Sequence, residues 1–221
     1  MARKTRTIGG FGQLWQRHEN LYRTIFCNAL AQLMITDEQR KDEDAISEAL
    51  CPILRQVCFN HNDKPMPAEW EGPIAPVSNE ELKGGKIRKR PDFTCRLVNT
   101  FADSSEMHEI SLHVECKRLG KKTGSWNLNK NYIENGVIRF DSETHEYGKR
   151  APCGLMIGYI VSAKRNDVLN DVNSHLPTTI SALQFLFTKT VEYCDSLFKR
   201  RHVAPKHFKL IHIWVDLRSN H

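Results

Sequence analysis

The spacing of apolar residues predicts two helices at the start of the chain. From Gly12 to Met34, and again from Glu38 to Phe59, apolar side chains recur every three or four residues, which is the period of a helix with one buried face. Thr36 or Asp37 is the expected N-cap of the second helix. Pro52 lies within that helix and should kink or locally break it, because proline has no amide hydrogen.

Two neighbouring segments of alternating polarity predict a β-hairpin. The first strand is Phe93–Val98 and the second is His108–Leu119, with the turn at Asp103–Ser105. Successive side chains of a strand point to opposite faces. The apolar residues of the second strand should therefore share one face, and its polar residues, Glu115 and Lys117 among them, should share the other.

Four further elements complete the pattern: a helix over Leu128–Asn135, a strand over Cys153–Ser162, a helix over Asn166–Phe187 and a strand over His207–Leu217. The strand Cys153–Ser162 is apolar throughout, as is typical of a central strand covered on both faces. Residues 60–90 are rich in proline and glycine and are expected to form a long surface loop. Together the elements indicate an α/β domain with a mixed central sheet flanked by helices.

Composition narrows the class of protein. The chain has 221 residues, of which 40% are hydrophobic and 26% charged, which is typical of a single globular domain. The longest apolar run, Gly154–Val161, is too short to cross a bilayer, and no apolar segment of a secretory signal follows the basic N-terminus. Seven cysteines without a CxxC pair suggest buried thiols in a reducing compartment. We therefore expect a cytoplasmic protein without a membrane anchor.

Basic side chains are concentrated in three segments. The net charge of +6 favours anionic partners, and lysines and arginines cluster at Lys83–Arg90, Lys117–Lys122 and Lys199–Lys209. If the fold brings these segments together, they would form a groove for nucleic-acid phosphates. If it does not, they are three ordinary solvated surfaces, and charge alone leaves both alternatives open.

Two acidic residues and a lysine stand at matching places on the predicted hairpin. Asp92 opens the first strand, and Glu115 and Lys117 lie on the second at nearly the same distance from a turn near Ser104, so antiparallel pairing would place the two carboxylates opposite each other. Facing carboxylates repel unless a cation neutralises them, and Mg²⁺ prefers such oxygen ligands. The backbone carbonyl of Cys116 would be a third ligand, and Lys117 would orient or deprotonate the attacking water. These are the groups required for phosphodiester hydrolysis.

The pattern Pro91-Asp92 … Glu115-Cys116-Lys117 resembles the motif of the PD-(D/E)xK nuclease superfamily. The order of elements from about Glu38 to Leu217 is similar to the restriction-endonuclease-like αβββαβ core of that superfamily, here with an extra N-terminal helix. The resemblance implies a metal-dependent endonuclease that acts on DNA, with Mg²⁺ or Mn²⁺ as cofactor. No ATP-binding phosphate loop and no separate DNA-reading domain are evident in the sequence.

The resemblance also implies residues outside the motif. The helix before the sheet should supply a further acidic group, for which Glu48 is the preferred match and Glu43 and Asp44 are competitors. Trp126 follows the lysine strand beside basic residues, and it is the tryptophan to consider as a base-stacking platform. The residues expected to contact nucleic acid are Lys89, Arg90, Arg118, Lys121, Lys122, Lys130, Asn131 and Arg139.

The chain is expected to divide into a basic arm with the extra helix over residues 1–36 and a nuclease-like domain over 37–221. The extra helix could form a homodimer interface, which suits the cutting of two antiparallel strands. Residues 132–141, 147–149 and 154–159 are similar to segments of bacterial nuclease-like proteins from phage-defence loci. This suggests the effector of an anti-phage system, held silent by a regulatory or sensor subunit. A non-catalytic nucleic-acid-binding or scaffolding subunit, and RNA in place of DNA, remain alternatives.

Overall fold

The computed structural model describes residues 5–74, 76 and 89–218, which form an α/β fold around one mixed sheet of six strands. The elements, in chain order, are α1 (Thr5–Leu30), η1 (Gln39–Lys41), α2 (Glu43–Asn60), β1 (Glu69–Trp70), β2 (Phe93–Val98), η3 (Ser105–Met107), β3 (Glu109–Leu119), α4 (Leu128–Glu134), η4 (Val137–Asp141), β4 (Cys153–Ile160), α5 (Arg165–His175), β5 (Val191–Lys199) and β6 (His207–Asp216).

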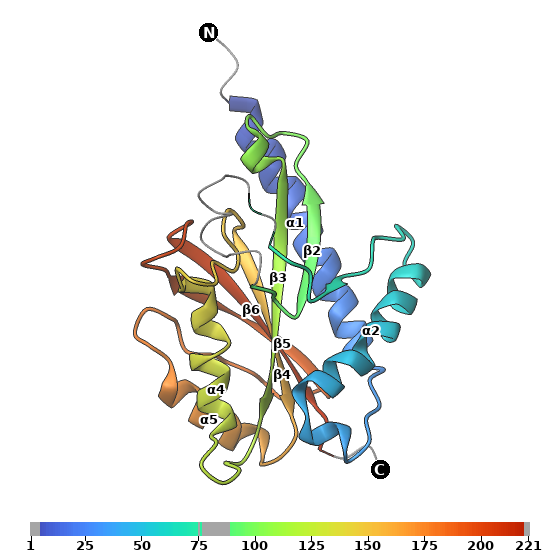
Figure 1. Cartoon of the computed structure of the whole chain (residues 1–221), viewed down its shortest axis with the longest axis vertical. Helices are drawn as coiled ribbons and strands as arrows, with labels where there is room; N and C mark the ends of the chain where they lie inside the picture. The colour runs from blue at the N-terminus through green and yellow to red at the C-terminus, as the bar shows by residue number, and fades with distance from the viewer. Residues whose placement is uncertain (1–4, 75, 77–88, 219–221) are drawn as a thin grey trace.

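The strands lie in the order β1-β2-β3-β4-β6-β5 (Figure 1). β2 is antiparallel to both β1 and β3, the strands β3, β4 and β6 run parallel, and β5 is antiparallel to β6. The predicted α/β class with a mixed sheet flanked by helices is thus confirmed. Among the described helices, none is long and apolar enough to cross a membrane.

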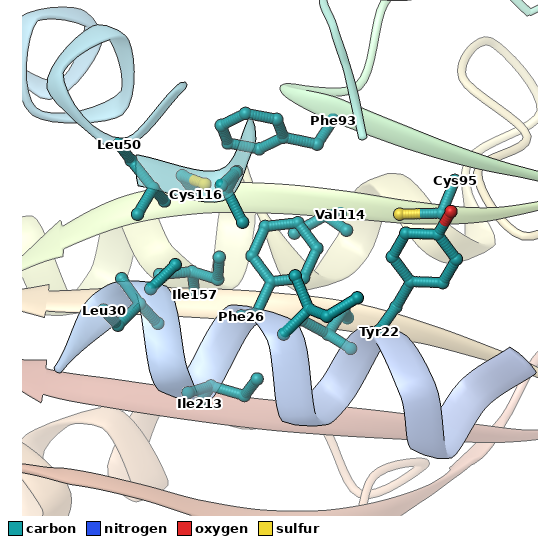
Figure 2. Close-up of a cluster of buried hydrophobic side chains, with 14 of the residues drawn as sticks. Tyr22, Phe26, Leu30, Leu50, Phe93, Cys95, Val114, Cys116, Ile157 and Ile213 are labelled. Atoms are coloured by element: carbon teal, nitrogen blue, oxygen red, sulfur yellow. The ribbon is translucent and has the colours of Figure 1, made fainter. Parts of the chain in front are cut away.

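Helices cover both faces of the sheet. α1 and α2 pack on one face, and α4 and α5 pack on the other. Figure 2 shows Tyr22, Phe26 and Leu30 along one side of α1, facing the strands, with Cys116 in the same cluster. Burial of each large apolar side chain contributes about 1.5–3 kcal/mol. The apolar face of α1 therefore belongs to the core of this chain, and α1 is not extra to that core.

α2 begins later than the sequence pattern predicts. Its N-cap is Asp42, whose side chain accepts a hydrogen bond from the amide of Asp44, while Thr36 instead accepts one from the amide of Gln39 at the short turn η1. Pro52 lies within α2 without ending it. The expected local break is therefore wrong.

The helix expected over 166–187 ends at His175, two residues before Pro177, because the residue that precedes a proline is disfavoured in helical conformation. The strand β5, which follows, is absent from the predicted elements. It is an edge strand whose side chains Tyr193 and Leu197 are exposed. Its apolar residues therefore do not mark a single buried face.

Candidate active site

The strand β3 extends beyond the start of its neighbour β2. Phe93, the first residue of β2, pairs with Val114, so residues 115–119 of β3 have no partner in β2. Asp92 directly precedes Phe93. If the same register continued by one residue, Asp92 would lie beside Glu115, as the hairpin geometry predicts. Backbone groups at this end of β3 must find other hydrogen-bond partners.

Two carboxylates accept hydrogen bonds from backbone amides of β3 that have no partner in β2. Asp92 Oδ2 accepts a hydrogen bond from the amide of Cys116 at 2.5 Å, and Glu43 Oε2 accepts one from the amide of Arg118 at 2.9 Å. Asp92 comes from the start of β2 and Glu43 from the first turn of α2. Both acids are thereby fixed against the free edge of β3.

Glu115 and Lys117 form a buried ion pair at the same place, with side-chain exposures of 0% and 7%. Lys117 Nζ lies 2.9 Å from Glu115 Oε1, 2.7 Å from Glu43 Oε1 and 2.7 Å from the carbonyl oxygen of Cys116. Arg139, from η4, donates to Glu115 Oε1 as well. The other carboxyl oxygen, Glu115 Oε2, is buried and has no hydrogen-bond partner among the described residues.

A glycine allows the chain to pass closely over this cluster. A Cβ atom at Gly136, between α4 and η4, would lie 2.5 Å from the carbonyl oxygen of Tyr132, 2.6 Å from Cε of Met156 on β4 and 3.1 Å from Cγ of Lys117. Any larger residue would displace the end of α4, the Met156 side chain or the lysine. Gly136 therefore sets the close packing that brings Arg139 to the cluster.

The cluster has too little positive charge for all its carboxyl groups to be ionised easily. Burial raises the pKa of Glu115 to about 8, with a further increase from the charge of Asp92, against the opposing effect of Lys117 and Arg139. Burial also raises the pKa of Asp92 to about 6. Burial alone would lower the pKa of Lys117, but the charges of Glu115, Glu43 and Asp92 hold it above its usual range.

These oxygen atoms fit a hard divalent cation. Mg²⁺ in proteins is bound by one or two carboxylates, with water completing its shell. Glu115 Oε2, the Asp92 carboxylate and the Cys116 carbonyl would be its ligands, and the cation would relieve the repulsion between two buried acids. No group of three or more His, Cys, Asp or Glu side chains within the described residues is arranged to hold a metal ion. The fit therefore rests on two carboxylates and a carbonyl.

Glu48, the helix carboxylate preferred from the sequence, is exposed on α2. No contact joins it to the cluster in the part of the chain that the structure describes. Its competitor Glu43 occupies the expected place, because α2 begins at Glu43 and the first turn of the helix meets the end of β3. The capping residue Asp42 was the sequence signal that could have located this first turn.

The residues expected to contact nucleic acid differ in exposure and in the contacts that they make. Arg139 is turned towards Glu115, and Arg118 donates from its guanidinium to the carbonyl of Lys41. Lys89 and Asn131 are half-buried, whereas the exposed members of the set are Arg90, Lys121, Lys122 and Lys130. The segment Lys83–Arg90 lies outside the described residues except for its last two positions.

In EDTA, the free energy of unfolding should fall as pH rises from about 6.5 to 8. The pKa of Glu115 is about 8 in the folded protein, well above its ordinary value, so the folded state holds a proton that the unfolded state lacks. This proton stabilises the folded state fully at pH values below the pKa of Glu115 in the unfolded chain. The stabilisation is lost as pH rises through the folded pKa of about 8. His113 and His212, whose pKa values burial lowers to about 4 and about 3, act in the opposite direction, chiefly below about pH 6.5.

Urea unfolding at several pH values would measure this effect, which should amount to roughly 1–2 kcal/mol. The seven free thiols also destabilise the protein near pH 8 as they ionise on unfolding. The relevant quantity is therefore the difference between wild type and Glu115→Gln, whose curve should be flatter. Identical slopes for the two proteins would contradict the raised pKa of Glu115.

Comparison with known proteins gave no relative: no family model, curated protein or solved structure matches the chain. The function proposed below therefore depends on the side-chain cluster itself and on the motif that it contains.

Proposed function

We propose that the protein is a metal-dependent endonuclease that hydrolyses phosphodiester bonds in DNA, with Mg²⁺ or Mn²⁺ as cofactor. One observation carries the proposal. Asp92, Glu115 and Lys117 meet beyond the start of β2, where Glu115 has a buried oxygen without a hydrogen-bond partner. Burial of a carboxyl oxygen without a partner costs about 1–3 kcal/mol, so a function that uses this oxygen explains why it is there.

The arrangement of elements supports the same proposal. Leaving aside the short 3-10 turns, the chain runs α2-β1-β2-β3-α4-β4 from α2 to β4. β2 is antiparallel to its neighbours β1 and β3, and β4 is parallel to β3. This order is similar to the αβββαβ core of the PD-(D/E)xK superfamily and supports the proposal on that ground. Asp92 directly precedes β2, and Glu115 and Lys117 lie in the second half of β3, as a nuclease of this kind would require.

Each side chain of the cluster has a distinct role in the proposed reaction. Asp92, Glu115 and the Cys116 carbonyl would hold the cation, which when bound would neutralise the carboxylates and polarise the phosphodiester. The raised pKa of Lys117 keeps its amine protonated, so it would orient the attacking water or a phosphate oxygen rather than remove a proton. Glu43 would hold Lys117 in position.

Arg139 has a further role in this proposal. In the metal-free cluster it contacts Glu115. A cation bound at Glu115 would compete with this contact, because three positive groups, the cation, Lys117 and Arg139, would then share one carboxyl group. The guanidinium would become available to the phosphate, with which it can form two parallel hydrogen bonds.

The alternative is a non-catalytic nucleic-acid-binding or scaffolding subunit, and one observation favours it. Asp92 and Glu43 accept hydrogen bonds from the free edge of β3, so both acids have a structural use that does not require catalysis. Glu115 accepts no backbone hydrogen bond of this kind and pairs instead with Lys117 and Arg139. An apolar set in place of a whole buried ion-pair cluster is commonly at least as stable, so the retention of this charged cluster favours the catalytic proposal.

The test is a cleavage assay on supercoiled plasmid, single-stranded DNA and RNA in Mg²⁺, Mn²⁺ or EDTA. Asp92→Asn is the sharpest variant, because its amide oxygen can still accept the hydrogen bond of Cys116 while its charge is lost. We expect metal-dependent cleavage by wild type and none by Asp92→Asn, with both proteins folded by circular dichroism. A wild-type protein that neither cleaves nor binds Mg²⁺ in calorimetry would refute the proposal.

Mg²⁺ binding without cleavage, abolished in Asp92→Asn, would instead support an effector that awaits its regulatory or sensor subunit. The anti-phage role, such a subunit and a homodimer stay predictions from the sequence.

The two helix carboxylates provide a matched pair of variants. Glu43→Gln should reduce the cleavage rate by about tenfold, in the range found for residues that position a metal ligand or its neighbours, because Glu43 contacts Lys117 at 2.7 Å. Glu48→Gln, in the same helix but exposed, should leave the rate unchanged. Initial rates of plasmid nicking measure both variants, and a larger loss in Glu48→Gln would restore Glu48 as the helix residue of the site.

A further inference from the structure

A groove of about 830 Å³ lies beyond the ends of β3 and β4. One side is formed by the turn η1 with Arg40 and Lys41, and the other by the loop that follows β3, with Trp126. This loop is at the lower end of the sheet in Figure 1. Arg118, near the end of β3, and Ser162, just after β4, line the groove between the two sides.

Trp126 is presented to solvent by a tight turn. Thr123 and Trp126 exchange two backbone hydrogen bonds, at 2.9 Å and 3.0 Å, and Gly124 within the turn has a φ of +60°, which few residues other than glycine adopt readily. The Trp126 residue is 54% exposed, whereas Trp15 and Trp214 are buried in the core. A large aromatic ring with more than half of its residue exposed at the surface of a groove is not placed there by core packing.

The groove carries an excess of positive charge. Arg40, Lys41 and Arg118 line it together with one acid, Asp37. Asp37 pairs with Arg40 at 2.7 Å and Glu38 pairs with Lys41 at 2.8 Å, so the excess comes from Arg118 and its basic neighbours. Lys121 and Lys122, in the same loop as Trp126, are exposed. In addition, the Nε atoms of Arg40 and Arg118 are buried without a hydrogen-bond partner in the described chain, so the protein does not fully satisfy these two guanidinium groups.

The groove adjoins the acidic cluster. Arg118 directly follows Lys117 in β3, and its amide donates to Glu43, the residue that contacts Lys117. Its guanidinium in turn donates to the carbonyl of Lys41 on the far side of the groove. A ligand in the groove would therefore lie beside the cluster rather than at a remote surface.

We propose that this groove binds single-stranded DNA, with one base stacked on Trp126 and the neighbouring phosphates against Lys41 and Arg118. The combination of a positively charged groove and an exposed aromatic ring is the arrangement that binds unpaired strands without sequence preference. In a duplex, base pairing and stacking cover both faces of each base, so Trp126 would contribute little. That the bound strand is cut rests on the function proposed above, but its binding does not.

Fluorescence anisotropy in EDTA tests binding in the absence of cleavage. Labelled single-stranded and duplex oligonucleotides of one sequence would be titrated with wild type, Trp126→Ala, Trp126→Phe and Phe59→Ala. Stacking on an aromatic side chain is typically worth about 1–3 kcal/mol per base, so Trp126→Ala should weaken single-strand binding by roughly 5- to 150-fold. Trp126→Phe should recover part of the loss, and duplex affinity should change less than about twofold.

Phe59→Ala is the matched control, because Phe59 is an aromatic residue at the other end of α2 with 66% exposure, and its removal should leave both affinities unchanged. Quenching of tryptophan fluorescence by single-stranded DNA should largely disappear in Trp126→Phe. Equal losses for single strand and duplex, or no loss in Trp126→Ala, would overturn the inference.

The cleavage assay separates this result from the proposed function. Metal-dependent nicking together with unchanged binding by Trp126→Ala would refute the groove and leave the nuclease proposal intact. Trp126-dependent binding without cleavage in any metal would support the groove and count against the nuclease.

Discussion

Replacing Lys117 with methionine should reduce metal-dependent DNA cleavage by about 10²- to 10⁴-fold. The amine is held by Glu115, Glu43 and the Cys116 carbonyl, so its position next to the bond being cleaved would be fixed before the substrate arrives. Methionine keeps most of the side-chain volume but supplies neither the charge nor the hydrogen bonds. Initial rates of plasmid nicking at saturating Mg²⁺ measure the effect.

Calorimetry distinguishes this role from a structural one. Loss of the positive charge at position 117 removes a group that repels the cation, so Lys117→Met should bind Mg²⁺ at least as tightly as wild type. The carboxyl of Glu115, with its pKa of about 8, can take up a proton and so limit the cost of losing its partner.

The matched control is Lys189→Met, which removes an exposed lysine between α5 and β5, outside the cluster and the residues expected to contact nucleic acid, and should cleave normally. Full activity in Lys117→Met would remove the lysine from the proposed mechanism.

The hairpin that holds the site could be predicted from the sequence because its residues obey the alternation of a half-buried strand. The predicted strand Phe93–Val98 matches β2, and the predicted second strand differs from β3 only by His108 at its start. Cys116 points into the core, as expected. Glu115 and Lys117 lie on the opposite face, also as expected, but that face is buried too, with Arg139 of η4 against Glu115.

The contacts that complete the site come from elements distant in sequence, and no local pattern specifies them. Glu43 contacts Lys117, which lies 74 residues further along the chain. Arg139 contacts Glu115, which lies 24 residues before it. Their places depend on where α2 begins and on how closely Gly136 lets the chain approach. Charge patterning is no better a guide, because Arg200, within the third basic segment, is buried and donates to the carbonyl oxygens of Phe140 and Gly148.

The affinity for Mg²⁺ should increase by roughly 50- to 100-fold between pH 6 and pH 8. A cation binds carboxylates only after they release their protons. The pKa of Glu115 is about 8 and that of Asp92 about 6, so over most of this range Asp92 is ionised while Glu115 must lose a proton for the metal to bind. The association constant should therefore rise nearly tenfold per pH unit until Glu115 is ionised, and then level off above about pH 8.

Isothermal titration calorimetry at pH 6, 7 and 8, in buffers of different ionisation enthalpy, measures both the affinity and the number of protons released. About one proton should be released per Mg²⁺ near pH 7. Glu48→Gln should reproduce the wild-type profile, because Glu48 does not contact the cluster, whereas Glu115→Gln should lose most of the affinity and its pH dependence. A wild-type affinity that is constant from pH 6 to pH 8 would show that Mg²⁺ does not bind at Glu115, and the proposed metal site would then be wrong even if the protein cleaves DNA.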